Sequence, residues 1–200
     1  MKKLIPGAAL VLASLTIAAG PAPMKWNVDV PHSGVAFSVN HFFTPVSGKF
    51  DNYEVDLMFD HENPANSSVS VRIDVNSINT GNERRDNHLL SGDFFEADTH
   101  GVITFESESV RAVSSDELLV RGPLTIKGVT RDVELPIRIL GIRDIPAEMQ
   151  EMLGGITQVA GFQSELEIDR SDYGVGVGSW AAALVVGHEV TIDIAVEANR

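Results

Sequence analysis

The stretch YEVDLMFDHENPANSSVSVRIDV, residues 53–75, decides the fold class because it holds two strand patterns separated by a turn. Apolar residues occupy every second position from 53 to 59, and the same period of two returns from 69 to 75. Side chains of a β-strand alternate between its two faces, so each segment has one apolar and one polar face. Asn63-Pro64 is a turn signal. The stretch therefore predicts two antiparallel strands, each with one face buried.

The same period of two recurs in six further segments, with turn residues such as Lys127-Gly128 between some of them. These segments cover residues 35–39, 103–105, 119–126, 133–139, 160–168 and 190–196. Eight short strands, each with one apolar face, predict an all-β domain built as a sandwich or a closed barrel. Pro136 lies inside one strand pattern, where proline requires an edge, a bulge or a bend.

Two short helices are expected among the strands. One covers residues 82–90, where Asn82 is a suitable N-cap. The other covers residues 146–153, with Pro146 in the first turn and Gly154 as the C-terminal stop.

Small residues on the apolar strand faces allow two interpretations of how the protein interior is filled. Ala160 and Ser164 share a strand face with Phe162 and Leu166, and residues 174–178 alternate glycine with valine. An eight-stranded barrel has either a filled interior or room for one small ligand. The gaps are consistent with a cavity and equally with close packing of a twisted sheet.

The first residues have the pattern of a secretory signal peptide: a basic start, an apolar run and small residues. We expect a signal peptide over residues 1–19 and a mature domain over 20–200, hence an exported, periplasmic protein. An uncleaved membrane anchor is the alternative, but the apolar run is short for one. Loss of Lys2 and Lys3 changes the net charge from −13 to −15. Such an acidic surface repels phosphate backbones, so nucleic acid is not expected as a partner.

Several motifs occur together in the order and spacing of one known family. They are Trp26-x-x-Asp29-x-x-His32-Ser33, Ser77-Ile78-x-Thr80, Arg85-Asp86-x-His88-Leu89, Asp93-Phe94-Phe95, Gly122-x-Leu124-Thr125-Ile126 and Ile168-Asp169-Arg170-x-Asp172-Tyr173-Gly174. With these motifs the chain resembles the YceI-like family of exported, lipocalin-like proteins. It departs from the family pattern at Gly101, where a proline is usual, and at Tyr173, where phenylalanine is common.

The resemblance implies an eight-stranded antiparallel lipocalin-like barrel with an apolar pore. It also implies a binder of a polyisoprenoid-type amphiphile, such as an isoprenoid quinone, a prenyl phosphate or a fatty amide, for transport, storage or stress protection. Beyond such a bound lipid or quinone, no cofactor is expected. Strand alternation predicts twelve residues that line the pore: Phe37, Val39, Tyr53, Leu57, Val71, Ile73, Phe105, Leu135, Ile137, Phe162, Leu166 and Ile192.

The polar cluster at residues 84–88 has three interpretations. Asp86 and His88 are acid and base candidates, but two helical positions apart they lie on different faces. The cluster can instead belong to a lid, or tie its loop to the barrel, either through its neighbours or through Asp169-Arg170. The predicted head-group or lid residues are Arg85, His88, Leu89, Phe94, Phe95 and Tyr173.

The histidines give little support for a metal site. His32 and His41 are the nearest to a usable pair, but an odd separation places them on opposite faces of a regular strand. No metal site and no enzymatic activity are therefore expected. An enzyme acting on an amphiphile and a docking module for a membrane redox partner remain the alternatives to a lipid binder. Transient contact with membrane proteins and a homodimer are compatible with the sequence.

Overall fold

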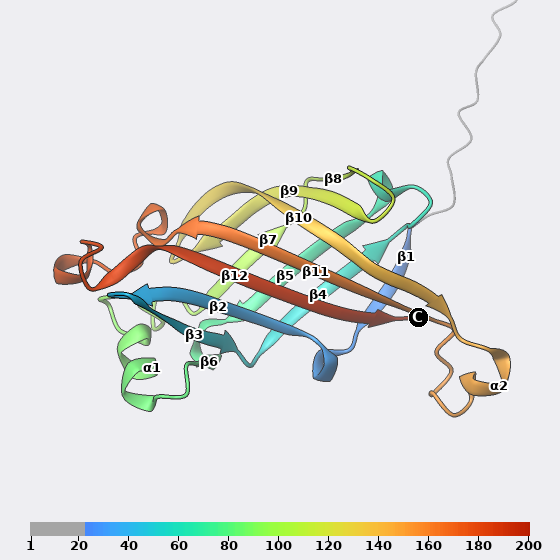
Figure 1. Ribbon diagram of the computed structural model, residues 1–200, viewed down its shortest axis with the longest axis horizontal. Coiled ribbons are helices and arrows are strands. Elements are labelled where there is room, and N and C mark those ends of the chain that lie inside the picture. The colour runs from blue at the N-terminus through green and yellow to red at the C-terminus, as the bar shows by residue number, and fades with distance from the viewer. Residues whose placement is uncertain (1–22) are drawn as a thin grey trace, which may run out of the picture.

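Eight antiparallel strands close into a barrel in the computed structural model, which describes residues 23–200, so the expected signal peptide lies outside the described residues (Figure 1). Around the barrel the strands are β1 (Met24–Val28), β4 (Tyr53–Phe59), β5 (Ser68–Asp74), β7 (Val102–Glu106), β9 (Glu117–Ile126), β10 (Val129–Asp144), β11 (Gln158–Asp169) and β12 (Val186–Asn199). Strand β1 pairs with β4 on one side and with β12 on the other, which closes the ring. The prediction of an eight-stranded antiparallel barrel is confirmed.

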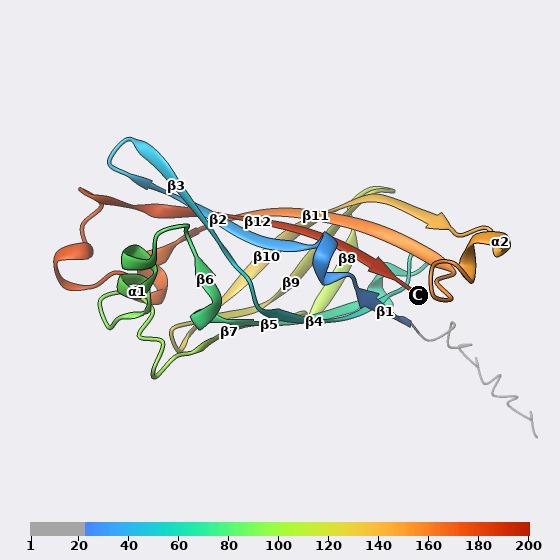
Figure 2. The same cartoon turned by 90° about the horizontal axis from the view of Figure 1, so that it is seen from below.

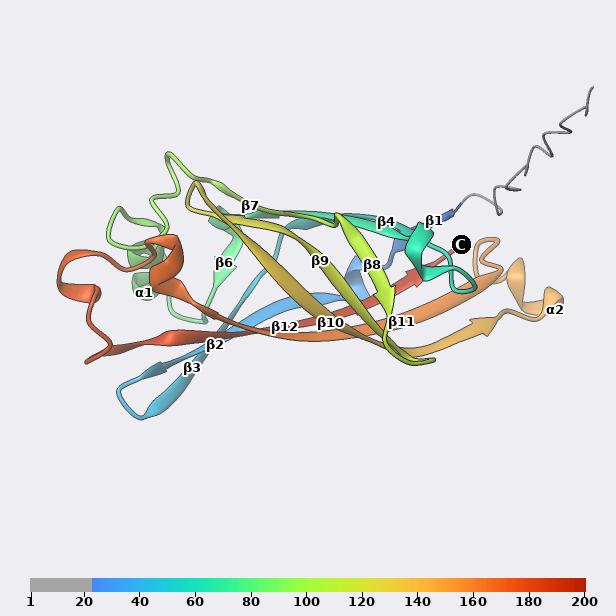
Figure 3. The same cartoon turned by 90° about the horizontal axis from the view of Figure 1, so that it is seen from above.

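The N-terminal strand of the barrel is split in two. A 3-10 turn, Val30–His32, separates β1 from β2 (Gly34–His41), and both pair with β12. The remaining strands of this part are β3 (Thr44–Phe50), which pairs with β2, and β6 (Ile78–Asn79), which pairs with β3. Strands β2 and β3 extend the sheet beyond the ring toward the end that carries α1, as Figure 2 and Figure 3 show.

Helices α1 (Glu83–Leu90) and α2 (Ala147–Gln150) lie at opposite ends of the barrel (Figure 1). The side chain of Asn82 accepts a hydrogen bond from the backbone N–H of Arg85 at 3.1 Å, so the first predicted helix and its N-cap are confirmed. The second prediction was too long, and Pro146 is the N-cap rather than a first-turn residue.

Residues 151–155 continue α2 as a turn, and Gly154, the predicted stop, lies at the end of that turn. Gly154 and Gly155 both adopt positive φ, 71° and 89°. The N–H of Gly155 bonds the carbonyl of Gln150 at 2.7 Å, a pattern that terminates helices. Further 3-10 turns lie at Pro64–Asn66, Val75–Ser77, Arg170–Tyr173 and Gly178–Trp180.

The predicted alternation sets which side chains face the interior. In β4, Tyr53 and Phe59 are buried whereas Glu54 is exposed. Pro136 pairs with β9, but the ladder between β10 and β11 begins only at Ile137, so this proline lies at an edge as predicted. The predicted strands do not include the short strand β8 (Ser109–Ala112), which pairs with β9.

Aromatic side chains occupy the barrel interior beside the C-terminal end of β12. The rings of Trp26 and Phe59 lie 5.9 Å apart, and those of Phe59 and Phe162 lie 5.1 Å apart in an edge-on arrangement. The indole N–H of Trp26 donates to the carbonyl of Phe59 at 3.2 Å. This cluster fixes the side where the barrel closes.

Candidate ligand-binding cavity

The barrel encloses a cavity of about 260 Å³ whose walls are almost entirely apolar. Side chains from the barrel strands, from β2 and β3, and from the segment around α1 surround it. The volume of the cavity is close to that of binding sites for small organic ligands. Such sites are mostly apolar and have a few polar groups at defined positions. Of the two interpretations of the small residues, the structure therefore favours the cavity.

All twelve residues predicted from strand alternation line this cavity. They come from strands β2, β4, β5, β7, β10, β11 and β12, so the register of each strand was predicted correctly at these positions. The set missed part of the wall, for example Val110, Leu118 and Val120. Alternation along β9 carries the signal for Leu118 and Val120. Whether these side chains bind a ligand stays a prediction.

Two hydroxyl groups lie among these apolar side chains. Within the described part of the chain, neither the Tyr53 hydroxyl nor the Ser164 hydroxyl has a hydrogen-bond partner, and both are buried. Burial raises the pKa of the Tyr53 phenol above its ordinary value, and it does the same for Tyr173, which also lines the cavity. Unpaired buried hydroxyls are costly, so these are the positions where the wall can recognise a polar group.

A lid, defined here as residues 83–95, closes the cavity at the α1 end. Leu89, Phe94 and Phe95 contribute to the cavity wall, as predicted for a lid. The ring of Phe95 meets Phe50 edge-on at 6.3 Å, and Phe94 packs 5.7 Å from Trp180. The lid therefore contacts the cavity through apolar side chains.

Arg85 and Asp86 fasten the lid to the strand before it. Arg85 donates from Nε to the hydroxyl of Thr80 and from Nη2 to its carbonyl, both at 2.7 Å. Asp86 accepts from the backbone N–H of Thr80 at 2.9 Å and from its hydroxyl at 2.5 Å. Of the three interpretations, the geometry supports the tie, although its partner is Thr80 and not Asp169-Arg170. Arg85 therefore belongs to the lid, as predicted, and does not line the cavity, and contact with a head group stays a prediction.

His88 also is not part of the cavity wall. Its Nε2 lies 3.0 Å from the carboxylate of Asp93, and its ring meets Phe94 and Trp180 edge-on, each at 5.1 Å. His88 thus belongs to the lid without lining the cavity, and contact with a head group stays a prediction. Asp86 and His88 engage different partners, as their helical spacing predicted.

Among the residues that the structure describes, the cation that lines the cavity is Arg170. Its guanidinium is buried and donates to the carbonyls of Val175, Gly176, Trp180, Val186 and Gly187, at 2.7 to 3.3 Å. Among the described residues, no carboxylate forms an ion pair with it. Burial lowers the pKa of Arg170, but an arginine keeps its charge at neutral pH. From the sequence, Arg170 is predicted only as a partner that ties the lid to the barrel.

Arg170 thereby organises the connecting segment between β11 and β12, residues 170–185, which lies against the lid. Gly176 has a φ of +82°, and a side chain there would collide with the guanidinium. The N–H of Val177 donates to the carbonyl of Asp93 at 2.8 Å, and Lys127 bridges the carbonyls of Gly92 and Gly174. A buried positive charge is therefore fixed beneath the lid, beside Tyr173.

Known proteins resemble this chain along nearly its whole length. The family described as the YceI-like domain matches residues 26–198. Protein YceI of Escherichia coli O157:H7 is 34% identical over 201 residues, covering 98% of this chain and 97% of the relative.

Solved structures share the barrel. The structure of Burkholderia cenocepacia BcnA has a TM-score of 0.75 at 27% identity, covering 86% of this chain and 99% of that one. A polyisoprenoid binding domain from Saccharophagus degradans has a TM-score of 0.59 at 19% identity, covering 87% and 97%, a likeness of fold alone.

Proposed function

The chain belongs to the YceI-like family, and on that premise we propose that it is an exported, periplasmic binder of a polyisoprenoid-type amphiphile. The observation that carries the proposal is the apolar cavity of about 260 Å³ inside the barrel. One protein of the same fold is a polyisoprenoid binding domain, which is consistent with this use of the architecture. The ligand classes are isoprenoid quinones, prenyl phosphates and fatty amides.

Burial of the tail supplies most of the affinity in this proposal. Removal of apolar surface from water contributes roughly 25 cal/mol per Å², without any directed hydrogen bond. The strand faces that hold Val71, Ile137 and Phe162 offer such a surface. The binding energy then depends on tail length more than on the chemistry of the polar end.

The polar end is proposed to lie beneath the lid, near Arg170 and Tyr173. Both residues line the cavity, and the Arg170 charge has no carboxylate partner among the described residues. The N–H groups of Arg170 are engaged by carbonyls, so its contribution is the field of its charge, which favours a carbonyl or phosphate oxygen. Tyr173 offers a phenol for a hydrogen bond.

In this role the protein binds and releases its ligand unchanged, for transport, storage or stress protection. It would collect the amphiphile through transient contact with a membrane or a membrane protein. Movement of the lid is the step that we propose admits the ligand, because the lid packs on the cavity through Leu89, Phe94 and Phe95.

The test is to extract the mature protein, purified from a periplasmic fraction, with organic solvent and to identify the released lipid by mass spectrometry. Ile137→Trp fills the cavity from its wall, and Arg138→Trp places the same side chain on the exposed face of β10. We expect a stoichiometric amphiphile in the wild type and in Arg138→Trp, and its loss in Ile137→Trp. A blank wild-type extract, repeated after isoprenoid lipids are offered in excess, would overturn the proposal.

A further inference from the structure

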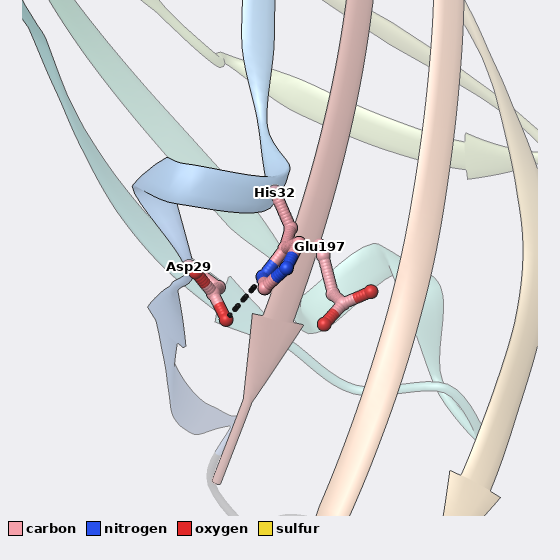
Figure 4. A group of neighbouring side chains, drawn as sticks. All are labelled: Asp29, His32 and Glu197. Carbon is pink, nitrogen blue, oxygen red and sulfur yellow. Dashed lines mark hydrogen bonds and ion pairs between the residues drawn. The ribbon is translucent and has the colours of Figure 1, made fainter.

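A second group of chemically active side chains lies outside the barrel, away from the cavity. Asp29, His32 and Glu197 place one ligand atom each within 4.8 Å of one another (Figure 4). Asp29 precedes the 3-10 turn that links β1 to β2, His32 ends that turn, and Glu197 lies near the end of β12. From the sequence, His32 and His41 come nearest to a usable pair of metal ligands. In the structure the neighbours of His32 are instead the carboxylates of Asp29 and Glu197.

We propose that Asp29, His32 and Glu197 form a binding site for a divalent transition-metal cation, with Zn²⁺ as its natural occupant. One imidazole and two carboxylates are a typical donor set for zinc, and three protein ligands leave a fourth position for water. Calcium and magnesium prefer all-oxygen sites, so the imidazole favours zinc over them.

The distances suit such an ion. His32 Nδ1 lies 3.0 Å from Asp29 Oδ2. In a tetrahedral zinc site, two ligand atoms that each lie about 2.0–2.1 Å from the ion are about 3.3 Å apart. Binding of the ion therefore requires only a small increase in the distance between His32 Nδ1 and Asp29 Oδ2. In Figure 4 the imidazole lies between the two carboxylates. When the His32 imidazole is neutral, the carboxylates of Asp29 and Glu197 give the group two negative charges. A divalent cation neutralises them.

The backbone beneath the three side chains is held in place independently of any ion. Ser33 Oγ donates to the carbonyl of Asp29 at 2.7 Å and accepts from the N–H of Glu197 at 3.0 Å. The N–H of Asp29 donates to the carbonyl of Glu197 at 2.8 Å. The ligand positions are thus fixed relative to one another before binding, which lowers the entropic cost of assembling the site.

The location gives the cation a structural consequence. The group straddles the seam where the barrel closes, just beyond the two ladder pairs of β1 and β12, Asn27 with Asn199 and Val28 with Ala198. Two ligands come from the N-terminal segment and the third from β12. A bound cation would therefore bridge the seam and hold it shut.

Calorimetric titration of the metal-free mature protein with ZnCl₂ at pH 7.5 tests the site. We expect saturable binding of one equivalent, weakened by at least about tenfold in His32→Ala and in Glu197→Gln. His61→Ala removes another exposed histidine and should bind like the wild type. Absence of saturable binding, or equal binding in His32→Ala and the wild type, would overturn the proposal.

Hydrogen exchange tests the bridge itself. Zinc should slow exchange of the Asp29 amide, which bonds to the carbonyl of Glu197, in the wild type but not in Glu197→Gln. If Glu197→Gln binds zinc and slows this exchange as the wild type does, the cation does not span the seam and the three-ligand site is refuted.

Discussion

The carboxylate of Asp86 accepts hydrogen bonds from the backbone N–H and from the hydroxyl of Thr80, so it fixes the start of the lid to the end of β6. Replacement by alanine removes both bonds and leaves Arg85 to hold Thr80 alone. We expect Asp86→Ala to lower the free energy of unfolding by about 1–3 kcal/mol, measured by urea denaturation.

The same variant tests the lid as the route for the ligand. A loosened lid should release bound amphiphile faster than the wild type, whereas Glu83→Ala, an exposed change in the same helix, should alter neither stability nor release. If Asp86→Ala is destabilised but releases the amphiphile at the wild-type rate, the tie to Thr80 does not control ligand entry. That result would count against the lid as a gate.

Arg170 is expected to be one of the most sensitive positions in the chain. Arg170→Met leaves five backbone carbonyls without their donor, and we expect a loss of about 3–5 kcal/mol in unfolding free energy. Arg170→Lys should recover only part of it, because an ammonium has three donors. Arg72→Met, on the exposed face of β5, is the control and should change stability by less than about 0.5 kcal/mol.

A smaller loss in Arg170→Met than in Arg170→Lys would show that the connecting segment repacks around an apolar side chain. The buried charge would then be unnecessary for the fold. That result would favour a role for Arg170 at the polar end of the ligand.

The cavity wall was predictable from sequence because strand alternation fixes the face of every side chain. Phe37 and Leu166 could be assigned to the wall without knowing which strands are neighbours, since each strand must bury its apolar face. The branching of the sheet at β12 was not predictable, because it depends on a three-residue turn that divides β1 from β2.

The contacts of the polar residues, by contrast, could not be predicted from the sequence. Arg85 and Arg170 are both arginines beside acidic residues in sequence, and only one reaches the cavity. Their partners are a threonine in one case and backbone carbonyls in the other. Carbonyls occur in every residue, so no sequence pattern marks them as partners. The grouping of His32 with Glu197 joins distant segments and has no local signal either.

The pH dependence of stability should report on His32 in the metal-free protein. The hydrogen bond to Asp29 raises the pKa of His32, and the charges of Asp29 and Glu197 add to this effect. A raised pKa in the folded state stabilises the fold below the ordinary histidine pKa of about 6.5, and this stabilisation is lost as pH rises through the folded pKa.

We therefore expect the stability difference between wild type and His32→Gln to shrink from pH 6 to pH 8, as measured by denaturation in the presence of EDTA. His61→Gln should show no such trend. A difference that stays constant or grows with pH would contradict the pairing of a protonated His32 with Asp29.

Ser164 offers the last test, because its hydroxyl is buried in the cavity wall without a hydrogen-bond partner among the described residues. Ser164→Ala removes that group and should raise the unfolding free energy of the delipidated protein by about 1 kcal/mol. Ser70→Ala, on the exposed face of β5, should have no effect. If the same Ser164→Ala change weakens retention of the extracted amphiphile, the hydroxyl contacts the ligand. A destabilised delipidated variant would instead mean that the hydroxyl is satisfied, as by a bound water, and that the wall is less apolar than described.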